Sequence, residues 1–122
     1  MAAAAALLIA LPAGAHHSYA MFDMHREVNL EGTVRAFQWT NPHVWIDIVV
    51  NDRTTGKAEN WSIEGKGPVQ LVGDGWRRDS IKPGDKVSMV IHPLKQGTHG
   101  GSLLKVLVNG KEIGASATAA PR

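Results

Sequence analysis

The sequence contains no cysteine among its 122 residues. Disulfide bonds therefore cannot stabilise the fold, and metal sites that need thiolate ligands, such as structural zinc sites and blue-copper sites, are excluded. Packing of apolar side chains has to supply the stability of the folded chain.

Charge of one sign is not in excess either. Lys and Arg together number 13 and Asp and Glu 11, and the two signs are interspersed along the chain. No run of like charges predicts a face for a polyanion, so nucleic acid is not an expected partner.

Motifs for covalent or phosphate chemistry are missing as well. The serines occur in no nucleophile-elbow motif, and no glycine-rich phosphate loop precedes a helix. No catalytic residue is assigned on this basis. A binding protein is expected rather than an enzyme, and a small copper-dependent oxidoreductase is the catalytic alternative that stays open.

An apolar, alanine-rich leader occupies residues 1–15. The sequence Ala13-Gly14-Ala15 fits the small-x-small pattern of signal-peptidase sites, and residues 1–11 are too few to span a bilayer, which takes about 20 residues. We expect a signal peptide cut after Ala15, a periplasmic or secreted mature protein that does not span the membrane, and an N-terminus at His16. The alternative is an alanine-rich tail that stays attached.

The mature chain is expected to hold one all-β domain, residues 16–113, followed by a disordered polar tail, residues 114–122. Apolar residues recur with a period of two between turn residues. The expected strands are 27–39, 43–50, 58–64, 86–92, 102–108 and 111–113, with one helix at 67–74. Three strands, a short helix and further strands are typical of the small five-stranded Greek-key barrel called the oligonucleotide/oligosaccharide-binding (OB) fold.

Alternation also assigns faces to the first two strands. In the first strand the predicted core-facing residues are Val28, Leu30, Gly32, Val34 and Ala36. In the second strand alternation predicts a core face and an outer face. Its core face carries Val44, Ile46, Ile48 and Val50, and its outer face carries His43, Trp45, Asp47 and Val49.

Several short motifs along the chain suggest a family. They are His16-His17-Ser18, Phe22-Asp23, Leu30-Glu31-Gly32-Thr33-Val34, Asn41-Pro42-His43, Trp61 with Glu64, Gly75-Trp76 and Pro83-Gly84-Asp85. This set resembles the exported bacterial proteins grouped as domain of unknown function 6152. The resemblance implies export, a small β-barrel and an emphasis on the histidines, and it implies no reaction.

Histidines carry the most specific chemical hypothesis. A free N-terminal His16 would offer its α-amino nitrogen and its imidazole to one metal ion, His17 adds an imidazole, and His43 on the outer face is the expected third contributor. Nitrogen donors without thiolate favour copper, with zinc or nickel as alternatives. The sequence therefore predicts a metal-binding protein for carriage, storage or sensing, with copper as its ion.

Weaker candidate ligands are spread over the rest of the chain. They are His25, Met21, Met24, His92 and His99. For each of them a plain packing or surface role is the competing interpretation. A ring of His43, His92 and His99 would form only if their strand ends share one side of the barrel.

Four tryptophans support a different function. Trp39, Trp45 and Asp47 would form an exposed ligand surface, while Trp61 and Trp76 are expected to cover the barrel ends. The alternative function is thus a metal-free periplasmic binding module for a peptide, a sugar, or another periplasmic or membrane protein. Asp47 and Glu64 are a conceivable carboxylate pair, although nothing in the pattern brings them together.

Overall fold

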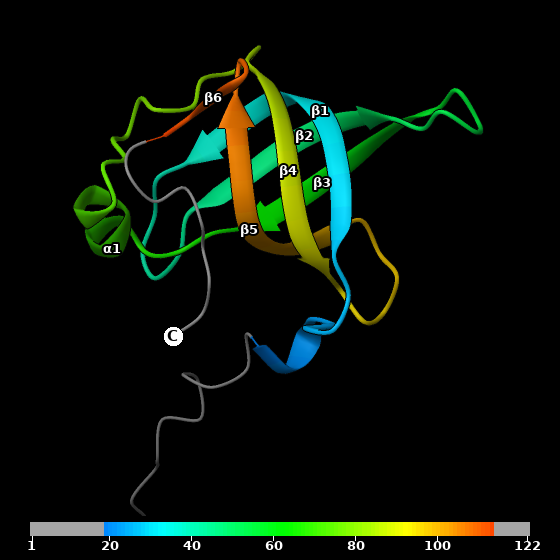
Figure 1. Ribbon diagram of the computed structural model, residues 1–122, viewed down its shortest axis with the longest axis horizontal. Coiled ribbons are helices and arrows are strands. Elements are labelled where there is room, and N and C mark those ends of the chain that lie inside the picture. Colours follow the sequence, from blue (N-terminus) through cyan, green and yellow to red (C-terminus); the bar gives the residue numbers. More distant parts are fainter. Residues whose placement is uncertain (1–18, 114–122) are drawn as a thin grey trace, which may run out of the picture.

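A computed structural model describes residues 19–113 of the chain. It contains a short 3-10 helix η1 (Tyr19–Met21), one α-helix α1 (Pro68–Gly73) and six strands (Figure 1). The strands are β1 (Val28–Gln38), β2 (Trp45–Asn51), β3 (Ala58–Glu64), β4 (Lys86–Pro93), β5 (Gly100–Val108) and β6 (Lys111–Glu112). The predicted leader, His16, His17 and the predicted tail lie outside the described residues.

Strands β1 to β5 curl into a closed barrel. The hydrogen-bonded order is β3-β2-β1-β4-β5-β6, and a parallel pairing of β3 with β5 joins the two ends of this sheet. Gly101 lies in the closing strand, where a Cβ atom would come within 2.6 Å of the His92 carbonyl oxygen. The OB-like barrel with one short helix between the third and fourth strands is therefore confirmed, and close backbone contact at Gly101 accompanies its closure.

The barrel interior is filled by alternating apolar side chains from every large strand. Ile46, Ile48, Ile63 and Ile91 are fully buried, as the period-two pattern predicts. The rest of the core cluster consists of Leu30, Val34, Val44, Leu71, Trp76, Ile81, Val87, Met89, Leu103, Val106 and Val108.

The predicted face of the first strand is wrong beyond Val34. The register of β1 against β2 shifts between Val34 and Ala36, so that Ala36 pairs with Asp47 and Phe37 pairs with Ile46. A bulge inserts one unpaired residue and moves every later side chain to the opposite face. Phe37, not Ala36, packs against the core.

Two strands start two residues away from the predicted position, and the other boundaries agree to within one residue. β2 begins at Trp45 because the backbone of Val44 bonds instead to Lys66 and Gly65, at 3.0 and 2.9 Å. β5 begins at Gly100 because its first residues pair with β3 in parallel. Both shifts arise from contacts with distant parts of the chain.

Helix α1 closes one end of the barrel (Figure 1). Trp76 follows the last helical residue, Gly73, by three positions in the sequence. Pro68 occupies the first turn of α1, where a missing N–H costs nothing, and the Gly67 N–H donates to Gln70 Oε1 at 3.1 Å. Trp76 is only 1% exposed, in agreement with its predicted role as a plug. None of the helices between residues 19 and 113 has the length and apolar character needed to cross a membrane.

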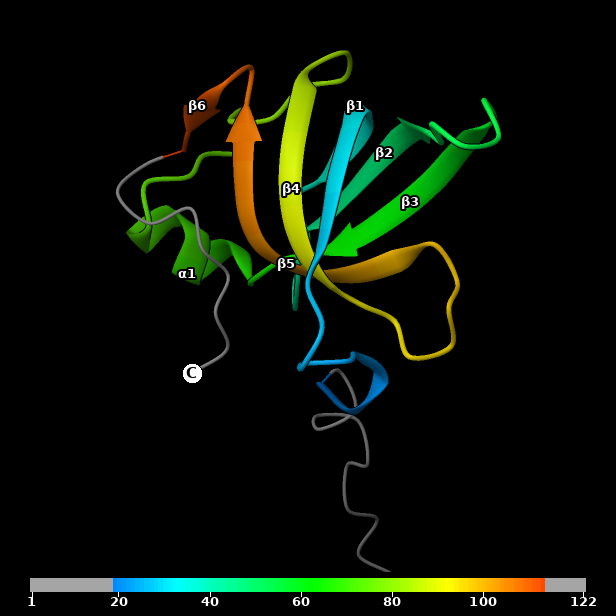
Figure 2. The same ribbon diagram turned by 45° about the vertical axis from the view of Figure 1, so that its right-hand side comes forward.

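The β2–β3 hairpin projects from the barrel and turns at residues 52–57 (Figure 2). Asp52 holds this turn, because its Oδ1 accepts the backbone N–H groups of Thr55 at 3.0 Å and Thr54 at 2.7 Å. These hydrogen bonds, that of Thr55 first, lower the pKa of Asp52 from its ordinary value of 3.8.

We expect Asp52→Asn to lower the free energy of unfolding at neutral pH, because the amide lacks the charge that strengthens these hydrogen bonds. A carboxyl with a lowered folded-state pKa stabilises the fold above its ordinary pKa and loses that contribution as the pH falls through the lowered value. The difference between the two proteins should therefore disappear in strong acid. Urea unfolding across acidic pH measures it, and a constant difference would contradict the assignment.

Candidate functional site

The site begins with a close pair formed by His43 and Glu64. His43 Nδ1 lies 2.5 Å from Glu64 Oε1, with 33% of the His43 side chain and 9% of the Glu64 side chain exposed. A carboxylate can only accept, so at this separation Nδ1 carries the proton. In the neutral ring the lone pair is then on Nε2, which makes no hydrogen bond with any residue from 20 to 113.

The loop between β1 and β2 is held firmly against the segment that follows β3. Thr40 Oγ1 donates to the His43 carbonyl oxygen at 2.9 Å, and Val44 exchanges backbone hydrogen bonds with Gly65 and Lys66. At Gly67 a Cβ atom would come within 2.7 Å of the Pro42 carbonyl oxygen. This close packing places the His43 ring beside Glu64, the last residue of β3.

A pocket of about 650 Å³ lies beside Glu64, which is one of its lining residues. Its floor is the outer face of β2 and β3, where Trp45 pairs directly with Glu64. Its walls come from η1 and from the loop after β4, which are joined by the Phe22–Leu94 bridge and by the Lys95 N–H donating to the Met21 carbonyl oxygen at 2.9 Å. The lining residues are Ala20, Met21, Phe22, Trp45, Ser62, Glu64, Leu94, Lys95, Gln96 and Gly101.

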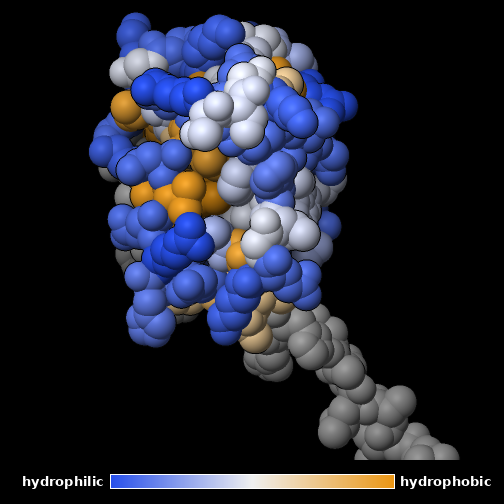
Figure 3. All heavy atoms as spheres, turned by 90° about the vertical axis from the view of Figure 1, so that its right-hand side faces the viewer, coloured by the Kyte–Doolittle hydropathy of each residue, from blue (hydrophilic) through white to orange (hydrophobic). Residues whose placement is uncertain are grey.

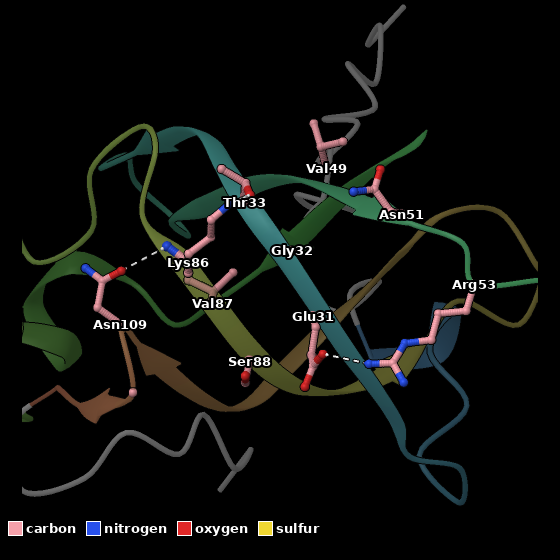
Figure 4. A pocket seen from close by; sticks show the side chains of 11 residues that line it. Glu31, Gly32, Thr33, Val49, Asn51, Arg53, Lys86, Val87, Ser88 and Asn109 are labelled. Carbon is pink, nitrogen blue, oxygen red and sulfur yellow. Dashed lines mark hydrogen bonds and ion pairs between the residues drawn. The ribbon is translucent and has the colours of Figure 1, made fainter. Parts of the chain in front are cut away.

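A second hollow, of about 510 Å³, lies over the middle of β1 (Figure 4). Its charged side chains already have partners: Arg53 pairs with Glu31 at 3.2 Å, and Lys86 Nζ donates to Thr33 Oγ1 at 2.7 Å. Figure 4 shows the Arg53 guanidinium and the Glu31 carboxylate turned toward each other. Because its charged groups are engaged within the protein, this hollow is a weaker candidate site than the pocket beside Glu64.

The other described histidines do not join His43. His92 is buried and its Nδ1 lies 2.8 Å from the Arg26 carbonyl oxygen, which ties the entry segment to β4. His99 stacks on Trp61 with ring centroids 4.8 Å apart, and its Nε2 lies 3.5 Å from Glu59 Oε2. His25 is exposed. Residues 19–113 contain no group of three or more histidine, aspartate or glutamate side chains placed to hold a metal ion.

The two methionines that were weaker candidates differ in their surroundings. Met21 is 48% exposed and lines the pocket, whereas Met24 lies half-buried in the turn before β1. The sulfur of Met21 is therefore the one that belongs to the pocket region.

The predicted aromatic surface divides between the two sides of the sheet. Trp45 and Asp47 lie on the outer face, where Ser62 Oγ donates to Asp47 Oδ1 at 2.8 Å. Trp39 follows the bulge and packs against the core, edge-on to Phe37 at a centroid distance of 5.8 Å. On the face in Figure 3, hydrophobic residues reach the surface in a limited strip bordered by hydrophilic ones.

Sequence reasoning did not find the pairing of His43 with Glu64 or the pocket. A usable signal existed for Glu64, because a hairpin joining β2 to β3 sets Trp45 opposite Glu64 once its turn is known. Asp47 pairs with Ser62, and this pair lies next to the Trp45–Glu64 pair on the same face. The carboxylates of Asp47 and Glu64 are therefore diagonal neighbours. The walls built by η1 and the loop after β4 have no local signal.

Comparison with known proteins gives one family and one fold. A family model described as "Family of unknown function (DUF6152)" matches residues 5–103. No curated protein matches the sequence.

Two crystal structures of the mitochondrial single-stranded DNA binding protein Rim1 from S. cerevisiae are similar in structure. One has a TM-score of 0.53 at 11% identity and covers 73% of this chain and 96% of that chain. A selenomethionine-labelled form has a TM-score of 0.46 at 10% identity, with coverages of 73% and 97%. At this identity, the first of these likenesses supports the barrel fold alone.

Proposed function

Because this chain belongs to the DUF6152 family, whose function is unknown, we propose a function from its own residues: it is an exported protein that binds a transition metal ion, copper above others. The observation that carries the proposal is the contact of His43 Nδ1 with the buried carboxylate of Glu64. A carboxylate behind one ring nitrogen orients the imidazole and fixes its tautomer, and it is one of the partners that commonly stand behind metal-ligating histidines.

Two further ligands come from the mature N-terminus in this proposal. Cleavage after Ala15 frees the amino group of His16, and His17 follows it. Ala20 lies at the pocket that Glu64 lines, and the four steps along the chain from His16 to Ala20 span at most about 14 Å when extended. That length supports a site shared by the N-terminus and the exposed edge of His43.

The donor set favours copper. An amine and imidazoles without thiolate or carboxylate ligands suit copper(II), which has the highest affinity among the divalent ions of its series, ahead of nickel and zinc. A site at the barrel surface, open to solvent, fits carriage, storage or sensing of the ion in the periplasm. Export itself is part of the proposal, because the amine exists only after cleavage.

His43→Ala is expected to weaken copper(II) binding to protein that begins at His16 by at least about 10- to 100-fold, the range seen when support of a ligand is lost. Glu64→Gln should weaken it by about tenfold, because the ring loses its orienting charge. Competition with a chelator of known affinity measures both values.

His25→Ala is the matched control, since His25 is exposed and lies in the same opening segment. It should bind copper as the parent protein does. Equal affinity for the parent and the His43→Ala variant would remove His43 from the site, and with it the proposal that the barrel takes part in holding the ion.

A further inference from the structure

The pocket beside Glu64 contains a hydrogen-bond acceptor that protein groups satisfy only in part. The Glu64 side chain is 9% exposed and His43 contacts its Oε1. Its Oε2 accepts no hydrogen bond from residues 20–113, and it is not one of the fully buried polar atoms of this range that lack a partner. Such an oxygen, lining an open pocket, is suited to a donor supplied by a ligand.

A second acceptor stands next to it on the same face of β3. Ser62 lies two residues before Glu64, so both side chains point to the outer face, and both line the pocket. The Ser62 hydroxyl gives its hydrogen to Asp47 Oδ1 at 2.8 Å and therefore presents its lone pairs to any further partner. The pocket floor thus offers acceptors and one formal negative charge.

Apolar groups form most of the remaining lining. Trp45 is the cross-strand partner of Glu64, and Phe22, Met21 and Leu94 close the pocket from η1 and from the loop after β4. The indole attracts an organic cation through the quadrupole of its ring, and the neighbouring carboxylate attracts it through its negative charge. The volume of about 650 Å³ is in the range of pockets that hold a small molecule.

We propose that this pocket binds a small organic amine, with a primary ammonium group at Glu64 and Ser62 and an apolar body against Trp45. An ammonium group has three donors and no acceptor, which matches a floor of acceptors. The positive charge of Lys95 at the rim repels an ammonium group, but the Lys95 side chain is exposed and its charge is screened by solvent. The pocket does not require the metal ion, and its occupation can be measured in the presence of EDTA.

The test compares three probes of one shape by isothermal titration calorimetry in EDTA. Phenethylamine carries the ammonium group, 2-phenylethanol replaces it with a neutral hydroxyl, and 3-phenylpropionate replaces it with a carboxylate. Phenethylamine is expected to bind about tenfold more tightly than the alcohol, and the carboxylate most weakly, because Glu64 attracts the first and repels the last. Equal binding of the amine and the alcohol overturns the proposal.

Three variants locate the binding. Trp45→Ala should weaken phenethylamine by about tenfold, through loss of the indole face and its apolar area. Glu64→Gln should remove the preference for the amine over the alcohol while the alcohol binds as before. Val69→Ala is the control, because Val69 is 83% exposed on α1 and lies outside the pocket lining.

The outcomes separate this inference from the metal site. Loss of copper binding in His43→Ala with amine binding retained leaves the pocket proposal standing. If Trp45→Ala binds phenethylamine as the parent does, the amine lies elsewhere and the pocket proposal fails, whatever the result with copper. If Glu64→Gln does not fold, the ranking of the three probes on the parent protein still decides.

Discussion

Copper(II) affinity is expected to fall by more than about a hundredfold, or about 2.7 kcal/mol, when the amino group of His16 is acetylated. Acetylation turns the amino group of His16 into an amide, which is a poor ligand in its protonated form. The imidazole of His16 then loses the chelate ring that it forms with its own amine. Every side chain of the barrel is unchanged by this addition.

The comparison needs two proteins that both start at His16 and differ only at this end, one with a free amino group and one acetylated there. Chelator competition gives the affinities, and electron paramagnetic resonance of the copper(II) forms reports the number of nitrogen ligands. The acetylated form should lose one nitrogen. Equal affinity and identical spectra from the two forms would falsify the N-terminal chelate and leave any copper binding to imidazoles alone.

The largest loss of stability is expected from Trp76→Ala, at about 3–5 kcal/mol in the free energy of unfolding. Trp76 is 1% exposed beneath α1, where its ring lies 6.2 Å from that of Phe37. Truncation to alanine opens a cavity at the end of the barrel that the rigid closed sheet cannot collapse to fill. Denaturant unfolding followed by circular dichroism gives the value.

Trp76→Phe is the matched variant. Nε1 of Trp76 is buried and has no hydrogen-bond partner among residues 20–113, a situation that costs about 1–3 kcal/mol. Phenylalanine keeps much of the ring and removes this N–H. The free energy of unfolding should therefore fall by less than half as much as it does for Trp76→Ala. Similar losses in both variants would show that the indole fits this position by shape and that its N–H costs little.

The sequence predicted the parts of the barrel that depend on neighbouring residues. The β3 strand was predicted as 58–64 and has those bounds, and the strands and helix around it agree to within two residues. Alternation of apolar residues is a local signal, and buried Ile46 and Ile48 follow it strictly. Pro68 and the glycines beyond residue 72 marked the ends of α1 in the same way.

The pairing of residues far apart in the chain could not be predicted from the sequence pattern. The bulge between Val34 and Ala36 moved Trp39 from the predicted outer surface to the core side, which separated it from Trp45. A shift of one residue in register leaves the sequence pattern almost unchanged but exchanges the two faces of a strand. The contact of His43 with Glu64 likewise depends on how the β1–β2 loop packs on the segment after β3.

By itself, then, the sequence determined an all-β chain with a short helix, no thiol chemistry and histidines as the candidate ligands, because composition and period-two alternation are properties of the chain read in order. Only the tertiary structure decided which histidine has a carboxylate behind it and where a pocket opens. The parallel pairing of β3 with β5 and the Phe22–Leu94 bridge create that pocket by joining segments far apart in sequence. Such contacts depend on the packing of the whole barrel, which no local pattern encodes.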